Sequence, residues 1–363
     1  MAKKPFVTSF SASDDVKPLR HHAAYVIRFL SLLVIVIGFS GCATTTSRRV
    51  TLDVPFVAQK PNFCGPAALA MIANYYGYRV TQDDIAGAIY LPEVRGTLTT
   101  ELADYAHQFN FWARQYRGSE NDLREKLAAG VPLIVLGRFG NHWHYFVVLD
   151  VDDFQQTLTV HSDTRANVQF PQDEFRRFWD HADRWTLLIC PPARATWALS
   201  ADEQNDLGVF FERTGQIPTA TEHYRAAVRL RPGNSYFQMN LGNALLEQKL
   251  FKKAAAAYAR AVQLDSENAD AINNLASVSA ELGADLDQAV QLCQHAIALR
   301  PSHRAYYFDT LGSVLLKQGK VDDALAAFKS ALAATTDRQT ALRAGIQQRL
   351  AATRAVAGRQ GNE

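Results

Sequence analysis

The chain has 363 residues, of which 48% are hydrophobic and 20% are charged, a balance that excludes intrinsic disorder and provides for two or three domains. Its net charge of +2 gives no reason to expect a nucleic acid as a partner. The four cysteines are scattered, with no C-x-x-C pair and no zinc spacing, so we expect no metal or other cofactor. Four cysteines in a chain of this length are too sparse for us to expect a disulfide framework.

The N-terminal segment has the pattern of an export signal. Residues 1–28 are basic and rich in serine, and residues 29–41 are almost wholly apolar. An apolar run of this length is typical of a signal-peptide core and is too short for a comfortable bilayer span. We therefore expect a signal peptide over residues 1–41. Two alternatives stay open: an uncleaved membrane anchor, or a start codon set ahead of a shorter signal.

The apolar run ends in Phe39-Ser40-Gly41-Cys42. This resembles the lipobox of bacterial lipoproteins, in which small residues precede a cysteine that is lipidated and becomes the new N-terminus. The resemblance implies lipidation of Cys42, a flexible tether over residues 42–50 and attachment to the membrane through the lipid anchor. Because Ala43 and not an aspartate follows, it also implies a bacterial cell-envelope protein of the outer membrane that faces the periplasm.

Residues 54–77 place a cysteine at the start of an apolar helix. The apolar run from Val54 to Val57 predicts a strand, and the apolar residues that follow Pro66 predict a buried helix. Cys64 lies at the helix N-terminus, where unpaired N–H groups and the helix dipole favour a thiolate and lower the thiol pKa. Gln59 lies just upstream, where its amide can donate to an oxyanion. A buried, inert cysteine is the alternative.

The pattern then changes from helices to strands. Capping signals and apolar spacing predict helices over residues 81–89, 100–109 and 119–130, and strands over residues 131–136, 145–151, 158–161 and 185–189. Helices first and strands afterwards are typical of an α+β domain with an antiparallel sheet.

Two polar side chains lie at the ends of neighbouring predicted strands. His144 directly precedes an apolar strand, where an imidazole can reach a thiol on a facing helix; His142 is the competing candidate. Asp163 ends the next strand, where its carboxylate can accept from the far nitrogen of His144 and fix the tautomer. His161 can point the same way. A strand-capping histidine and a turn aspartate are the structural alternatives.

Together these features resemble the bacteriocin-processing peptidase family of the papain-like clan and its lipoprotein relatives with helical repeats. The resemblance rests on VPFVAQ, on CGPAALAM followed by NYYG, on HYFVVL, on the aspartate that closes the next strand, and on FPQDEFRRFW, which resembles the terminal helix of the family. It implies a papain-like peptidase domain over residues 51–192, with Cys64 as nucleophile, His144 as base, Asp163 as its orienting carboxylate and Gln59 as oxyanion donor. No fused exporter is predicted, so the double-glycine leader substrate of the classical members is not expected.

A repeat begins after Cys190 and two prolines. Leucine and a small residue recur at steps of 34, 34 and 36 residues, in Leu207-Gly208, Leu241-Gly242, Leu275-Ala276 and Leu311-Gly312. A second position in phase with them carries Tyr224, Tyr258, Cys293 and Phe328. The pattern resembles tetratricopeptide repeats and predicts four of them over residues 201–338, with a capping helix and tail over residues 339–363. Cys190 and Cys293 are expected in the core.

The expected fold is thus an α+β papain-like peptidase domain followed by an all-α tetratricopeptide-repeat solenoid. The expected function is that of a lipoprotein thiol peptidase, a hydrolase of peptide bonds. Its partners would be a peptide or protein substrate, a protein in the repeat groove and the membrane, with no nucleic acid. The alternative is a non-catalytic peptide-binding or scaffold lipoprotein; for the repeats alone, a spacer is the simplest alternative.

Overall fold

The structure, a computed structural model, describes residues 51–140 and 142–360. The predicted signal peptide, the predicted lipidation site Cys42 and the whole predicted tether lie outside the described residues. Among the residues described, no helix is long and apolar enough to cross a membrane.

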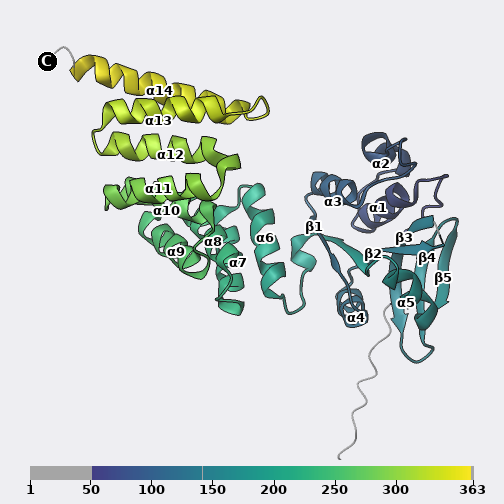
Figure 1. Cartoon of the computed structure of the whole chain (residues 1–363). Coiled ribbons are helices and arrows are strands. Elements are labelled where there is room, and N and C mark those ends of the chain that lie inside the picture. The colour runs from purple at the N-terminus through teal and green to yellow at the C-terminus, as the bar shows by residue number, and fades with distance from the viewer. Residues whose placement is uncertain (1–50, 141, 361–363) are drawn as a thin grey trace, which may run out of the picture. The chain divides into compact units, whose positions relative to one another are not determined.

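The first domain consists of helices and one antiparallel sheet (Figure 1). Its helices are α1 (Cys64–Tyr75), α2 (Gln82–Ile89), α3 (Thr99–Ala106), α4 (Glu120–Ala128) and α5 (Gln172–Asp180). Its strands are β1 (Trp112–Arg117), β2 (Leu133–Phe139), β3 (His142–Asp152), β4 (Thr157–Ser162), β5 (Arg165–Pro171) and β6 (Trp185–Cys190). The strands lie in the order β1-β6-β2-β3-β4-β5, so β2 and β3 occupy the centre.

Helix α1 is the buried element of this domain. Its residues Gly65 to Ala73 are all buried, as the almost continuous apolar sequence predicts, and the helix packs against β3. The central strand contributes Tyr145 to Leu149, which are buried too. Cys64 therefore begins a helix that rests on the middle of the sheet.

The segment from Val54 to Val57, predicted as a strand, is not one. Pro55 has no N–H to donate to a neighbouring strand, and the carbonyl of Val54 accepts a hydrogen bond from the His161 side chain at 2.8 Å. This apolar segment is therefore held by a side-chain hydrogen bond and not by the backbone hydrogen bonds of a β-sheet.

The second part of the chain is helical throughout, in pairs that stack one beside the next (Figure 1). Its helices are α6 (Ala201–Arg213), α7 (Ile217–Leu230), α8 (Ser235–Glu247), α9 (Phe251–Leu264), α10 (Ala269–Leu282), α11 (Leu286–Leu299), α12 (Arg304–Lys317), α13 (Val321–Ala334) and α14 (Thr340–Gln360). The predicted fold class, an α+β domain followed by an all-α solenoid, is confirmed.

A glycine and an aromatic ring fill each crossing point within three of the pairs. A Cβ added to Gly242 would lie 2.5 Å from the Tyr258 ring, and one added to Gly312 would lie 2.6 Å from the Phe328 ring. Only glycine lets the ring approach the helix this closely. In the third pair the glycine is replaced by Ala276 and the ring by Cys293, and both residues are buried in one cluster.

A buried charge links α4 of the first domain to α6. The side chain of Lys126 is 3% exposed, and its Nζ lies 3.2 Å from Oε1 of Glu203 and 3.3 Å from Oδ1 of Asp122. The ammonium also lies 4.2 Å from the centre of the Trp197 ring, in a cation–π contact. Leu207 of α6 extends the apolar core of the first domain across the same junction.

Candidate active site

Cys64 is the first residue of α1, at an end that no side chain caps. Its thiol is half-buried, whereas Cys190 and Cys293 are fully buried in their cores, as expected. Burial raises the pKa of the Cys64 thiol, and hydrogen bonding from the backbone of Tyr145 and Gly65, which lowers the pKa, does not offset it. The expected lowering of the thiol pKa is therefore wrong for the protein without substrate: loss of hydration outweighs the helix N-terminus.

His144 lies on β3, opposite Gly137 of β2. Its Nε2 is 3.2 Å from Oγ of Ser162, and its ring packs edge-on against Phe146 at 4.7 Å between centroids. Burial lowers the pKa of His144, and the charge of Asp163 raises it by less. In the tautomer that carries its hydrogen on Nε2 and donates it to Ser162, Nδ1 is the nitrogen that can take a proton from a thiol.

Asp163 follows β4 in a left-handed conformation, with φ of +57°. Its carboxylate is exposed and acts electrostatically on both Cys64 and His144. Within the described residues, no hydrogen bond joins His144 to Asp163 or to Cys64. The contact that the sequence predicts for Asp163, at the far nitrogen of the imidazole, is made here by its neighbour Ser162.

The backbone around Gln59 is held from two sides. The Gln59 N–H donates to the carbonyl of Asp163 at 3.1 Å. The buried Gln82 donates from Nε2 to the carbonyl of Ala58 and accepts at Oε1 from the N–H of Lys60, both at 2.8 Å. Gln59, the predicted oxyanion donor, is thus fixed between two clamped neighbours.

The two other histidines near β3 and β4 behave differently. His161 donates from Nε2 to the carbonyl of Val54 and accepts at Nδ1 from the N–H of Asn167 at 3.2 Å. Both nitrogens are used by the backbone, so the expectation that His161 can point the same way as Asp163, toward His144, is wrong. His142 is exposed and lines the same cleft as His144, so it stays the alternative candidate for the base.

One cleft of about 940 Å³ contains all four predicted site residues, Cys64, His144, Asp163 and Gln59. Sequence reasoning missed Ser162 and Gln82, because neither belongs to a motif and both act through contacts with residues distant in the chain. Periodicity could have indicated only that Ser162 continues an alternating strand.

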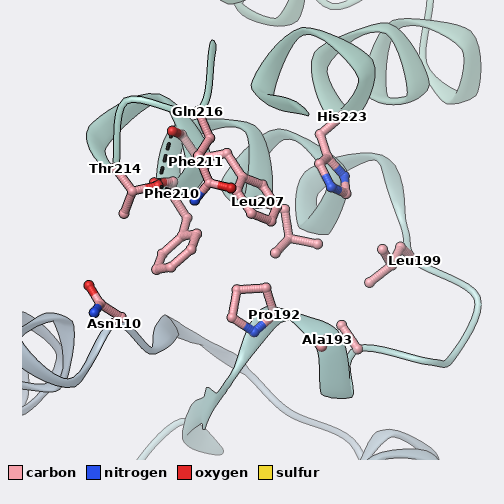
Figure 2. A pocket seen from close by; sticks show the side chains of 11 residues that line it. Asn110, Pro192, Ala193, Leu199, Leu207, Phe210, Phe211, Thr214, Gln216 and His223 are labelled. Atoms are coloured by element: carbon pink, nitrogen blue, oxygen red, sulfur yellow. Dashed lines mark hydrogen bonds between the residues drawn. The ribbon is translucent and has the colours of Figure 1, made fainter. Parts of the chain in front are cut away.

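A second cavity, of about 670 Å³, shares no lining residue with the first (Figure 2). Phe210, Phe211 and Leu207 of α6 form much of its wall, and His223 is its titratable group. The His223 ring stacks on Phe211 at 5.1 Å, and its Nδ1 lies 2.8 Å from Gln204 Oε1. The lining of this cavity includes no cysteine, and His223 has no acidic partner among the lining residues.

A cysteine that opens a buried helix, a histidine on a central antiparallel strand and a helical array behind them define the class: a papain-like cysteine peptidase fold with helical repeats. Residues 53–192 match the Peptidase C39 family, and residues 205–269 and 310–344 match the Tetratricopeptide repeat family. The chain therefore combines a Peptidase C39 domain with C-terminal tetratricopeptide repeats.

Among curated proteins, the chain is similar to Protein STIP1 homolog of Dictyostelium discoideum, with 36% identity over 26% of this chain and 18% of that protein. It is also similar to Protein O-mannosyl-transferase TMTC3 of Homo sapiens, with 31% identity over 29% of this chain and 12% of that protein. The chain thus spans less than a fifth of these relatives.

Among solved structures, a crystal structure of MamA shares 25% identity over 37% of this chain and 77% of that chain, with a TM-score of 0.34. MamA 41-end from Desulfovibrio magneticus RS-1 shares 14% identity over 44% of this chain and 85% of that chain, with a TM-score of 0.38.

Proposed function

We propose that the chain is a thiol peptidase in which Cys64 attacks a peptide carbonyl and His144 takes the thiol proton at Nδ1. His144 then gives that proton to the leaving amine, and water hydrolyses the thioester. The side-chain amide of Gln59 and the N–H of Cys64 donate to the oxyanion. The observation that carries the proposal is the cleft that contains the sulfur, the imidazole, the amide and the carboxylate.

The electrostatics favour a particular timing of the proton transfer. Because burial raises the pKa of the Cys64 thiol and lowers that of His144, the resting pair is neutral. The thiol then loses its proton as it attacks, and not before substrate binds. Ser162 at Nε2 and the charge of Asp163 stabilise the imidazolium that forms.

A peptide-library cleavage assay tests this proposal. The full chain in detergent is incubated with mixed peptides, and new termini are identified by mass spectrometry. Products that form with the natural chain and not with Cys64→Ser support a peptidase. Equal products from both proteins, or none from either, would refute it.

A second candidate is a non-catalytic peptide-binding lipoprotein, which the raised thiol pKa and the missing hydrogen bond between Cys64 and His144 in the described structure favour. The repeats support an interaction with another protein in either case. If peptides bind the natural chain and Cys64→Ser with equal affinity and stay intact, this candidate replaces the first.

We also propose that Cys42 is lipidated and anchors the chain in the bacterial outer membrane, facing the periplasm. The support is the apolar run that ends in a small-residue pair before Cys42. Globomycin treatment or Cys42→Ala should leave an unprocessed precursor of higher mass. An unchanged mass after either treatment would exclude lipidation.

A further inference from the structure

The buried side-chain amide of Gln82 bonds to the backbone on both sides of Gln59. Gln82 is the first residue of α2 and is 8% exposed. Its Nε2 donates to the carbonyl of Ala58, and its Oε1 accepts from the N–H of Lys60, each at 2.8 Å. In a parallel β-ladder, one residue of a strand bonds in the same way to the residues before and after its partner. Gln82 therefore acts as a one-residue substitute for a neighbouring strand.

The opposite edge of the same backbone is hydrogen-bonded too. The N–H of Gln59 donates to the carbonyl of Asp163 at 3.1 Å. With hydrogen bonds on both edges, the backbone at Gln59 is held against rotation, and its side chain must leave on one of the two remaining faces. That face is the cleft, because Gln59 lines it together with Cys64. The direction in which the Gln59 amide enters the cleft is therefore set by Gln82 and Asp163.

This anchoring also fixes the distance to the sulfur. Only four residues separate Gln59 from Cys64, so a shift of the Gln59 backbone moves its amide relative to the thiol. The ion pair of Lys60 and Asp83 joins the same segment to α2, but both side chains are more than half exposed, so it contributes little. The buried amide of Gln82 is thus the stronger of these two links to α2.

The precision matters because of how an oxyanion is stabilised. In the proposed reaction, negative charge develops on the carbonyl oxygen of the substrate only as the sulfur attacks. A donor that already points to this oxygen stabilises the transition state without reorganisation, and a displacement of about 1 Å can cost roughly 100-fold in rate. An apolar side chain at position 82 would fill the same space but would hold neither neighbour of Gln59.

We propose that Gln82 is a positioning residue for the oxyanion: by holding the backbone on both sides of Gln59, it aims the Gln59 amide at the substrate oxygen. This inference rests on the proposed function, since the oxyanion forms only when Cys64 attacks a carbonyl. Loss of Gln82 should therefore lower kcat and leave KM and the reactivity of the thiol unchanged, because the interaction is made only in the transition state.

Gln82→Met in the full chain tests the proposal, because methionine has a similar size and forms neither hydrogen bond. Both kcat and KM are measured on a peptide found by the library assay. We expect kcat to fall roughly 10- to 100-fold and KM to stay within about threefold, since complete removal of an oxyanion donor costs roughly 100- to 1000-fold. The alkylation rate of Cys64 by iodoacetamide should stay within about twofold, because displacement of iodide by the sulfur forms no oxyanion.

Gln172→Met is the matched control. Gln172 is the first residue of α5 and is 6% exposed, and its Nε2 donates to the carbonyl of Asp152 at 3.1 Å. It does not line the cleft. The two variants remove the same buried amide from the first residue of a helix, so we expect both to lower the melting temperature but only Gln82→Met to lower kcat.

A double-mutant cycle shows whether Gln82 acts through Gln59. In the Gln59→Ala background, Gln82→Met should lower kcat by less than about twofold, because the amide that it aims is already gone. If Gln82→Met does not fold, Gln82→Glu is measured in its place. Glutamate keeps the acceptor for the N–H of Lys60 and loses the donor to Ala58, so kcat should still fall by about threefold or more at constant KM.

A kcat of the folded variant that stays within about threefold of the natural chain would overturn the inference. So would an equal fall in kcat with Gln172→Met, a matching fall in the alkylation rate of Cys64, or losses from Gln59→Ala and Gln82→Met that multiply. The proposed function fails separately: if the natural chain cleaves no peptide, both are lost. If the natural chain and Gln82→Met cleave equally well, the peptidase activity stands and only this role of Gln82 is lost.

Discussion

The sheet domain and the repeat array bury similar side chains but are stabilised by contacts of different reach. In the array, Gly242 packs on Tyr258 and Gly312 on Phe328, each within one helix pair. In the sheet domain, the N–H of Gln59 binds the carbonyl of Asp163, and Ser162 binds His144. A short sequence repeat is therefore enough to specify the helical array. The candidate site, by contrast, forms only when residues far apart in the sequence are brought into contact by the sheet.

The largest expected effect is on the chemistry of the sheet domain. Cys64→Ser and His144→Ala should each lower peptide cleavage by roughly 10³-fold or more, because each removes one half of the nucleophile–base pair. The measurement is kcat/KM on a peptide found by the library assay. His142→Ala is the matched control, and we expect it to keep activity within about threefold; a larger loss with His142→Ala than with His144→Ala would reverse the assignment of the base.

The next largest effect is expected from a substitution at the junction between the sheet domain and the array. Lys126→Met removes the charge that faces Glu203 and Asp122 inside the protein, and we expect it to lower the free energy of unfolding by about 2–4 kcal/mol. Urea denaturation followed by circular dichroism measures the change.

Lys60→Met is the control for that variant. Lys60 pairs with Asp83 at the surface, with both side chains more than half exposed, so its loss should cost less than about 1 kcal/mol. Equal losses for the two lysines would show that burial of Lys126 does not matter to the junction.

Adding a single methyl group at a helix crossing should lower the stability of the array. Gly242→Ala brings Cβ to 2.5 Å from the Tyr258 ring, and we expect a loss of about 1–3 kcal/mol from overpacking. Gly87→Ala, in α2 with no atom within 4 Å, should instead gain up to about 1 kcal/mol from helix propensity. If both variants melt alike, the close approach of the ring does not constrain the array.

The last expected effect concerns pH and needs no variant. Burial raises the pKa of the Cys64 thiol and lowers that of His144, so we expect a neutral pair near neutral pH. Below the pKa of the thiol, the thiolate fraction grows about tenfold per pH unit. The alkylation rate of Cys64 by iodoacetamide should therefore rise continuously from about pH 6 to beyond about pH 9. A plateau between about pH 6 and about pH 8 would instead indicate a preformed thiolate–imidazolium pair.

Comparing the alkylation rates of Cys64, Cys190 and Cys293 gives the iodoacetamide experiment an internal control. Burial raises the pKa of both Cys190 and Cys293 to about 12, and both side chains are fully buried. Cys64 should be alkylated first near neutral pH, and His144→Ala should slow it. Labelling of Cys293 at the rate of Cys64 would mean that the array opens locally.

The sequence predicted the array and the four central strands because both have strong apolar patterns. It missed β1 and β5, which are the two edge strands of the sheet. Their side chains are mostly half-buried or exposed, so no apolar run or clean alternation distinguishes them from a loop.

The candidate site could be predicted only as far as its residue types allow. Cys64, His144, Asp163 and Gln59 were chosen from the sequence, and the structure places them in one cleft. The sign of the thiol pKa shift could not be read in advance, because it depends on how much protein covers the sulfur.

The third helix pair, with Ala276 and Cys293 in place of glycine and an aromatic ring, has a consequence for protein engineering. The four pairs look like interchangeable modules, but α11 cannot replace α9: a thiol facing Gly242 would leave a void where a phenol ring had been. Anyone who shuffles or duplicates these units should move both helices of a pair together.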